Sequence, residues 1–162
     1  MSKIFVSAMA YDNGQSGISD YINNTVLHLA QENKIDLLIL KKDIKTFPVK
    51  NDNIKFIPIS SRYAKPIVNM IWHLFIPFLF NLSKYDFVFL PAGNRRLFVK
   101  YPTTTVATVH DLSQFNIENK YDKLRMAYIK YLVPFFLKKV QKIVSISKNT
   151  KKDIVFFTNC SN

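Results

Sequence analysis

Short runs of apolar residues alternate with longer segments of helical period, and this alternation restricts the fold more than any other feature. Runs short enough to be buried strands stand at residues 4–10, 35–40, 54–59, 87–90, 104–109 and 143–146. After the first run, Ile18, Ile22, Val26 and Leu29 recur at the spacing of one helix face. Strands that alternate with helices form parallel sheets with crossover connections. We therefore predict an α/β, Rossmann-like fold, with a mostly parallel sheet of about six strands and helices on both faces.

Prolines interrupt two of the longer apolar segments. Residues 64–82 predict a helix that breaks near Pro77, and residues 119–140 predict a helix that Pro134 kinks or restarts. Proline has this effect because it lacks an N–H and its ring clashes with the preceding turn. A last helix is expected over residues 147–157.

The length and composition fit one folded domain. The chain has 162 residues, of which 48% are hydrophobic, which is enough for a core and too many for a disordered chain. We predict a single domain over residues 1–162. The one cysteine, Cys160, forms no internal disulfide and offers no zinc-ligand spacing. A reducing, cytoplasmic setting is the simplest interpretation.

Positive charge is concentrated in the second part of the chain. The net charge is +12, of which residues 1–62 contribute +2 (8 basic, 6 acidic) and residues 63–162 contribute +10 (15 basic, 5 acidic). Such a field attracts polyanions, meaning nucleic acid, anionic lipid headgroups or phosphorylated substrates. Charge alone does not choose among them.

One segment is a candidate for a membrane span. Residues 66–82 form an apolar run of 17 residues that contains Asn69, His73 and Pro77. A span needs about 20 mostly apolar residues. We therefore expect this segment to lie at a membrane interface or to pack against the sheet.

The segment 119–140 combines lysines and arginine with aromatic residues and has two interpretations. In one, an aromatic stripe faces the core and the cations are solvated. In the other, aromatic side chains enter a lipid headgroup region while the lysines meet anionic lipid.

Polar residues follow several of the predicted strands. They are Gly14 to Gly17, Gly93-Asn94, His110-Asp111 and Ser145 to Ser147. In open parallel sheets, ligands bind beyond the carboxyl ends of the strands. These residues are therefore the candidate binding residues.

Each of these candidates also has a plain structural interpretation. The glycine loop can approach a ligand closely or be an ordinary strand-to-helix turn. His110 can donate a hydrogen bond to a sugar hydroxyl or a developing oxyanion, and it can titrate near neutrality. Asp111 can orient the loop, accept a hydrogen bond from a sugar hydroxyl or cap the next turn. Ser147 can be a helix N-cap. His28 and His73 fit packed or surface positions.

Four stretches, in order along the chain, are similar to motifs of one enzyme family. Residues 106–113 (VATVHDLS) resemble its hydrophobic strand followed by His-Asp-Leu, and residues 142–154 (KIVSISKNTKKDI) resemble its strand, serine and basic helix. Residues 16–22 (SGISDYI) resemble the glycine-rich run after its first strand, and residues 72–94 resemble its helix, strand and proline-containing turn. Over most of its length the chain thus resembles the GT4 family of glycosyltransferases, which have the GT-B fold.

The resemblance implies that the chain is the N-terminal, acceptor-side domain of a retaining glycosyltransferase. Such an enzyme moves a hexose from a nucleotide sugar to a glycan or lipid-linked acceptor, in polysaccharide or glycolipid synthesis. His110 would be the catalytic residue near the transferred sugar. The implied substrate-binding residues are Gly14, Gly17, Ser19, Asn94, Asp111 and Ser147.

The same resemblance implies a co-substrate, a location and a missing part. The nucleotide sugar is the donor, and no metal or other cofactor is expected. The enzyme would be cytoplasmic, at the inner face of the cell membrane. Whole enzymes of the family have a second, nucleotide-binding domain with a Glu-x7-Glu pair, which these 162 residues lack. They are therefore expected to be inactive alone.

The sequence departs from the family in the loop after the first strand. Ser19 stands where a second glycine is usual, and Asp20 stands where a basic residue is common.

The alternative is a basic domain without catalysis that binds a membrane surface or nucleic acid. No helix-turn-helix, RNP-type or zinc pattern is visible in the sequence. The polar residues stand at strand ends and not on a sheet face, which argues against nucleic acid.

Overall fold

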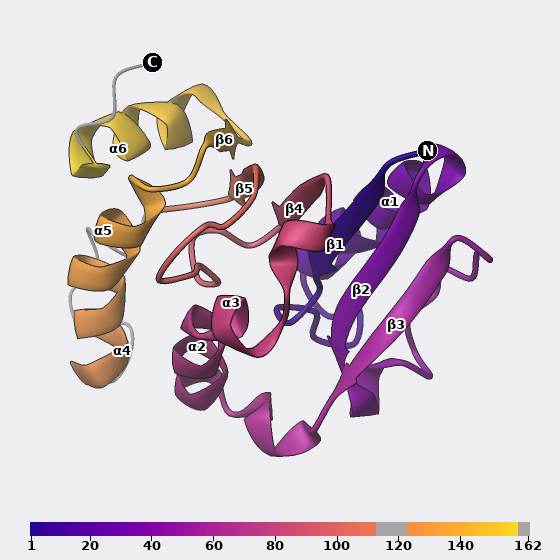
Figure 1. Cartoon of the computed structure of the whole chain (residues 1–162). Coiled ribbons are helices and arrows are strands. Elements are labelled where there is room, and N and C mark those ends of the chain that lie inside the picture. Colours follow the sequence, from indigo (N-terminus) through magenta and orange to yellow (C-terminus); the bar gives the residue numbers. More distant parts are fainter. Residues whose placement is uncertain (113–122, 159–162) are drawn as a thin grey trace.

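The computed structural model describes residues 1–112 and 123–158. Within this part of the chain, six strands form one sheet with the order β3-β2-β1-β4-β5-β6, and every neighbouring pair is parallel (Figure 1). The strands are β1 (Lys3–Ser7), β2 (Lys34–Leu40), β3 (Ile54–Ile59), β4 (Phe87–Leu90), β5 (Thr105–Val109) and β6 (Lys142–Ser145). The predicted α/β, Rossmann-like fold is confirmed.

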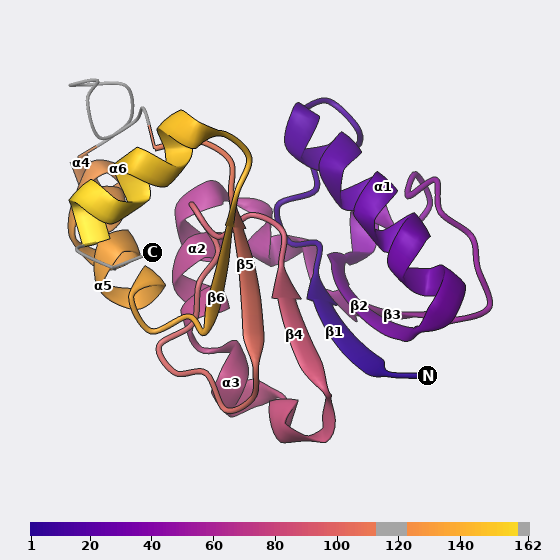
Figure 2. The ribbon, with the colours of Figure 1, turned by 90° about the horizontal axis from the view of Figure 1, so that it is seen from above.

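Helices cover both faces of the sheet (Figures 1 and 2). On one face, α1 (Gly17–Glu32) buries Ile22, Val26 and Ala30. On the other lie α2 (Pro66–Leu74), α3 (Ile76–Leu79), and the succession α4 (Lys123–Ala127), η5 (Tyr128–Leu132) and α5 (Val133–Leu137). Helix α6 (Lys148–Thr158) follows β6 and packs against α5. The short 3-10 turns are η1 (Lys41–Asp43), η2 (Ser61–Ala64) and η3 (Leu82–Lys84).

The strand β2 shows why its sequence is almost wholly apolar. Ile35, Leu37 and Ile39 pack in the core under α1, whereas Leu38 and Leu40 pack in the core under α2 and α5. Successive side chains of a strand point to opposite faces. Because helices cover both faces, both sets are buried.

Several strand boundaries differ from the prediction, and the end of β1 differs most. Strand β1 ends at Ser7 and not at Ala10, because the chain turns at Ala8, whose carbonyl accepts from the Tyr11 N–H at 3.0 Å. Strand β5 begins at Thr105, one residue late, and β6 covers residues 142–145 in place of 143–146. The loop after β1 therefore begins three residues earlier than the sequence indicated.

The segment 64–82 contains two helices, as the prediction of a break near Pro77 requires. The break is at Phe75, whose N–H donates to the Trp72 carbonyl at 3.0 Å. Pro77 lies in the first turn of α3, where its missing N–H costs nothing. Among the described residues, no helix has the length and apolar character needed to cross a membrane.

The helical segment around Pro134 neither stops nor restarts. It is wound as a π-helix in η5 just before the proline, and the Val133 N–H donates five residues back to the Tyr128 carbonyl. The wider turn makes room for the proline ring, which would clash in a regular α-helix. The predicted residues 119–122 lie outside the described residues.

Strands β1 and β4 are neighbours in the middle of the sheet. From this pair the chain winds outward in opposite directions, through β2 and β3 on one side and β5 and β6 on the other. Ligands of doubly wound sheets bind at this switch point, beyond the carboxyl ends of the strands.

Candidate functional site

His110 lies at the carboxyl end of β5 and is held by the end of β4. Its Nε2 is 2.6 Å from the carbonyl oxygen of Pro91. A carbonyl only accepts, so Nε2 carries the hydrogen, and the neutral ring leaves Nδ1 as an acceptor. No hydrogen bond from a described residue to Nδ1 occurs. In this tautomer Nδ1 has an acceptor lone pair, and the role of His110 toward a ligand stays a prediction.

Tyr21 of α1 packs against the His110 ring. The two ring centroids are 4.8 Å apart with an interplanar angle of 87°, an edge-on contact, and the Tyr21 hydroxyl lies 2.9 Å from Thr108 Oγ1. Tyr21 follows Gly17 by four residues, a rise of about 6 Å along the helix. His110 is thus one turn away from the start of α1. Tyr21 was not among the predicted site residues.

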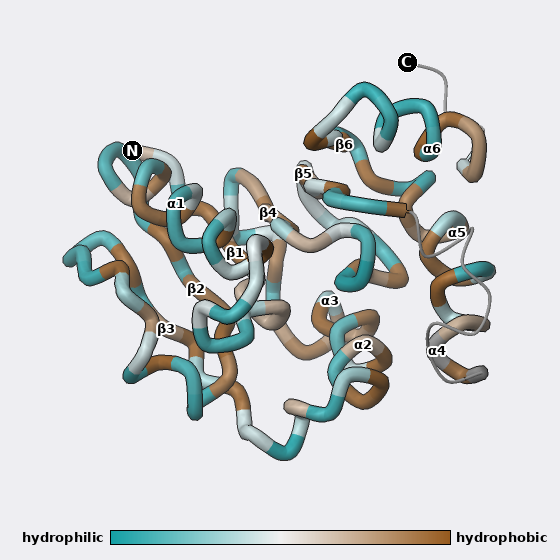
Figure 3. The backbone as a smooth tube through the Cα atoms, turned by 180° about the vertical axis from the view of Figure 1, so that it is seen from behind, coloured by the Kyte–Doolittle hydropathy of each residue, from teal (hydrophilic) through white to brown (hydrophobic). Residues whose placement is uncertain are grey.

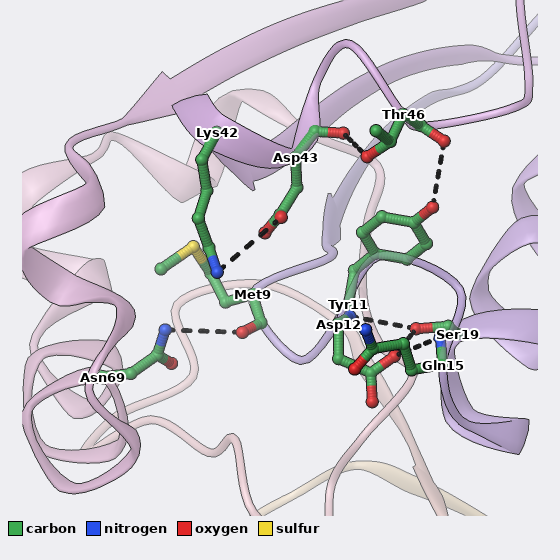
Figure 4. Close-up of polar contacts among 9 residues, drawn as sticks. All are labelled: Met9, Tyr11, Asp12, Gln15, Ser19, Lys42, Asp43, Thr46 and Asn69. Atoms are coloured by element: carbon green, nitrogen blue, oxygen red, sulfur yellow. Dashed lines mark hydrogen bonds and ion pairs between the residues drawn. The ribbon is translucent and has the colours of Figure 1, made fainter.

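The loop between β1 and α1 has a fixed shape built around Asp12 (Figure 4). Its Oδ1 accepts from the Ser19 hydroxyl at 2.5 Å and from the backbone N–H groups of Gln15 and Ser16 at 3.0 and 3.2 Å. Partial burial pushes the pKa of Asp12 up, but these hydrogen bonds outweigh it and lower the pKa. Gly14, with φ of 78°, supplies the left-handed conformation that the turn requires.

The predicted ligand contacts of this loop differ in accessibility. Ser19 is fully buried, and its hydroxyl also accepts from the Asp12 N–H at 3.0 Å. Ser19 therefore shapes the loop and presents no surface to a ligand. Gly17 is exposed at the first turn of α1, and a Cβ there would meet no atom within 4 Å. The open approach to the backbone is thus at Gly17.

The chain after β4 packs tightly onto β5. A Cβ on Gly93 would lie 2.9 Å from the Ala107 Cβ, so only glycine fits. Asn94 is 2% exposed and donates a long hydrogen bond of 3.4 Å from Nδ2 to the Asp111 carbonyl. No described residue bonds to its buried Oδ1. Asn94 and the Asp111 backbone are thus brought together, while the Asp111 side chain is exposed.

Ser147 caps α6, as the structural interpretation predicted. Its Oγ accepts from the Thr150 N–H at 3.0 Å. The Thr150 hydroxyl in turn donates to the His110 carbonyl at 3.2 Å. The Ser147 hydroxyl thus has a structural partner, and the start of α6 is tied to the His110 backbone.

A second polar group lies beyond β1 and β2, on the other side of the loop (Figure 4). Asp43 is 3% exposed; its Oδ1 is 3.9 Å from the Lys42 Nζ, and its Oδ2 has no partner among the described residues. The pKa of the Asp43 carboxyl is raised, chiefly by burial. The charge of Lys42 lowers the pKa, and the charge of Asp12 raises it. Asn69 of α2 reaches the Met9 carbonyl at 3.4 Å. Asp43 was not among the predicted site residues, although it follows a strand as His110 does.

His73 and Ser7 form a hydrogen-bonded pair that resembles a base and a nucleophile. The Ser7 Oγ is 2.7 Å from His73 Nε2, and His73 Nδ1 is 3.0 Å from the Leu97 carbonyl. However, Ser7 is 2% and His73 0% exposed, so no substrate reaches them. Their bonds join β1, α2 and the segment after β4, as the packed interpretation of His73 predicted.

Among the described residues, no group of three or more histidine, cysteine, aspartate or glutamate side chains could hold a metal ion. The expectation of a metal-free reaction stays a prediction.

Comparison of the chain with protein-family models, curated proteins and solved structures finds no match. Function is therefore inferred from the residues of this chain.

Proposed function

We propose that this chain is the acceptor-side half of a retaining glycosyltransferase. The complete enzyme would move a hexose from a nucleotide sugar to a glycan or lipid-linked acceptor, in polysaccharide or glycolipid synthesis. A second domain would bind the nucleotide, and the 162 residues alone would not turn over.

The proposal is supported most by the setting of His110. Pro91 and Tyr21, which are far apart in sequence, both hold its ring at the carboxyl edge of the sheet. This edge lies beside the switch point, where ligands of doubly wound sheets bind. The same edge contains the exposed Gly17 and the end of β4 at Asn94.

The proposed reaction exchanges one bond at the anomeric carbon. The bond to the phosphate oxygen breaks, and its electron pair leaves with the nucleoside diphosphate. The acceptor oxygen bonds to the same carbon, and its proton passes to the diphosphate. His110 would accept a hydrogen bond at Nδ1 from a hydroxyl of the transferred hexose, which fixes the sugar for reaction.

Hydrogen-bond acceptors near the loop suit a ligand rich in hydroxyl groups. Asp43 and Asn94 each have a buried oxygen without a donor among the described residues. A buried acceptor without a donor costs free energy, so a ligand hydroxyl that reaches it would supply the missing hydrogen bond. Asp43 is 3% and Asn94 2% exposed, so both side chains would contribute to binding only after the carboxyl edge of the sheet opens.

A transfer assay with the complete protein that contains this chain tests the proposal. The donors are UDP-glucose, UDP-galactose and GDP-mannose, with an extract of the producing cells as the source of acceptor. The measurement is release of UDP or GDP. We expect release by the wild type and a loss of about 100-fold or more in His110→Ala. The control is His28→Ala, because His28 is exposed on α1.

Two outcomes contradict the proposal. Absence of nucleotide release from every donor would refute glycosyl transfer, and full activity of His110→Ala would refute the role of His110. The coding sequence after Asn162 is an independent check, since the proposal requires a second Rossmann-like segment with Glu-x7-Glu.

A further inference from the structure

The helices opposite α1 expose large apolar side chains to solvent. The most prominent lie on α2, α3 and the η5–α5 segment, and include Phe78 at 61% and Tyr131 at 66% exposure. Figure 3 shows apolar stretches along α2 and along α4 and α5. We define the apolar helix face as Ile71, Phe75, Phe78, Leu79, Tyr131 and Phe135. Clusters of this kind on a soluble surface mark interaction sites.

A groove connects the two parts of this face. Its volume is about 360 Å³, and it lies between Ile67 and Ile71 of α2 and Leu124, Ala127 and Tyr131 of the α4–η5 segment. Its lining is almost wholly apolar. Of the apolar helix face, Ile71 and Tyr131 line this groove, which thus joins α2 to the α4–η5 segment.

Lysines stand over the exposed rings of this surface. The Nζ of Lys100 is 4.4 Å from the Phe78 ring centroid, and the Nζ of Lys139 is 4.2 Å from that of Phe135. Lys130 lies 5.9 Å from Tyr131 in the same way. Long lysine side chains can lie along apolar surface and keep the ammonium group in a polar layer.

Acidic residues are absent from the sequence of this face. Residues 53–85 and 87–110 contain no aspartate or glutamate, and neither do residues 123–152. The lysines beside the apolar helix face thus have no carboxylate on the same elements. On these elements, the surface combines exposed apolar groups with lysines that have no acidic neighbour in the same stretch of sequence.

We propose that the apolar helix face docks onto an anionic lipid bilayer. Phe78, Leu79 and their neighbours would enter the headgroup and acyl boundary, while Lys100, Lys130 and Lys139 meet lipid phosphates. This inference does not depend on glycosyl transfer.

Two other occupants fit this surface less well. A second copy of the chain would bring the lysines of both copies together, and like charges across an interface are costly. Nucleic acid would use the rings for stacking, but it gains little from the exposed aliphatic side chains Ile71 and Leu79. A bilayer satisfies the aromatic, aliphatic and cationic groups together.

Flotation of the 162-residue chain with lipid vesicles tests this proposal. One set of vesicles is phosphatidylcholine alone, and the other contains about 30% phosphatidylglycerol, at about 0.1 M and 0.5 M salt. We expect binding to the anionic vesicles at low salt and weaker binding at high salt. The double variants Phe78→Ser/Phe135→Ser and Lys100→Glu/Lys139→Glu should each lower the partition coefficient about tenfold or more.

The matched control is Phe156→Ser, because Phe156 is 77% exposed but lies on α6, outside the apolar helix face. It should bind like the wild type, and circular dichroism should show that all variants fold. Absence of wild-type flotation at low salt would overturn the proposal. So would undiminished flotation of Phe78→Ser/Phe135→Ser, which would indicate adsorption by net charge alone. A gel shift of mixed oligonucleotides that both double variants abolish, without vesicle binding, would assign the face to nucleic acid.

Discussion

Two histidines near the carboxyl edge of the sheet carry their hydrogens on opposite nitrogens. His110 donates from Nε2 to Pro91, whereas His73 donates from Nδ1 to Leu97 and accepts from Ser7 at Nε2. Each tautomer follows from a carbonyl partner that can only accept. The Nδ1 lone pair of His110 lies at a partly exposed position, whereas the Nε2 lone pair of His73 accepts the Ser7 hydrogen bond inside the core.

Buried His73 should make stability depend on pH. The pKa of His73 is lowered from 6.5 to about 3, because burial and, to a smaller extent, nearby Arg96 outweigh the hydrogen bond to the Leu97 carbonyl. The unfolded chain therefore binds a proton below pH 6.5 that the folded chain does not bind until about pH 3. Stability from this group is complete above pH 6.5 and falls as the pH drops toward 3, by at most about 1.4 kcal/mol per pH unit.

Urea unfolding at pH 7 and pH 5 measures this effect. We expect His73→Gln to be less stable at pH 7 but to lose less stability on acidification than the wild type. His28→Gln is the control, because it makes the same substitution at a histidine that is exposed on α1. If His73→Gln does not fold, the ring resonances of wild-type His73 decide the matter, since titration of that ring near pH 6 would contradict the prediction.

At the scale of elements, two glycines that come after strands of the sheet have different structural surroundings. Gly93 follows β4, and a Cβ there would press on β5 at Ala107 and Thr108. Gly17 begins α1 in open space. Gly93 lets the chain after β4 pack closely on β5, and Gly17 leaves open space beside the candidate site.

Alanine substitutions should separate these two roles. Gly93→Ala should lower the free energy of unfolding by about 1–3 kcal/mol, because strand and loop must move apart. Gly17→Ala should change it by less than about 1 kcal/mol and favour the helix. Urea midpoints measure both. Equal stability of the two variants would show that the end of β4 does not pack against β5 as described.

Much of the element order was predictable, because side-chain period reports local structure directly. Strands β2, β3 and β4 were placed within one residue, since each is a short, mostly apolar run. The end of β1 was misplaced because Ala8, Met9 and Ala10 are apolar yet form a turn. The π-helical turn before Pro134 leaves no periodic signal that would have revealed it.

At the scale of the molecule, one sheet separates two cores. The larger lies under α2 and α5 and includes Val109, while the other lies under α1. Because the strands contribute side chains to both cores, damage to one core should unfold the whole domain. Edge strand β6 is less protected, and its Val144 is 43% exposed.

A pair of valine substitutions tests this arrangement. Val109→Asp should abolish folding, because a buried charge without a partner costs several kcal/mol. Val144→Asp, on the next strand, should lower stability by about 1 kcal/mol or less. Circular dichroism and the urea midpoint measure both. A folded, stable Val109→Asp protein would contradict the inward orientation of this residue.

The sequence by itself determined the α/β class, the parallel sheet and the placement of His110 at a strand end. These depend on local periodicity, which specifies which side of an element is apolar. Periodicity does not specify which neighbour covers that side. Only the tertiary structure decided the strand order, the contact of Tyr21 with His110, the addition of Asp43 and the exposure of the apolar helix face. Each depends on residues far apart in the chain, whose packing no local pattern encodes.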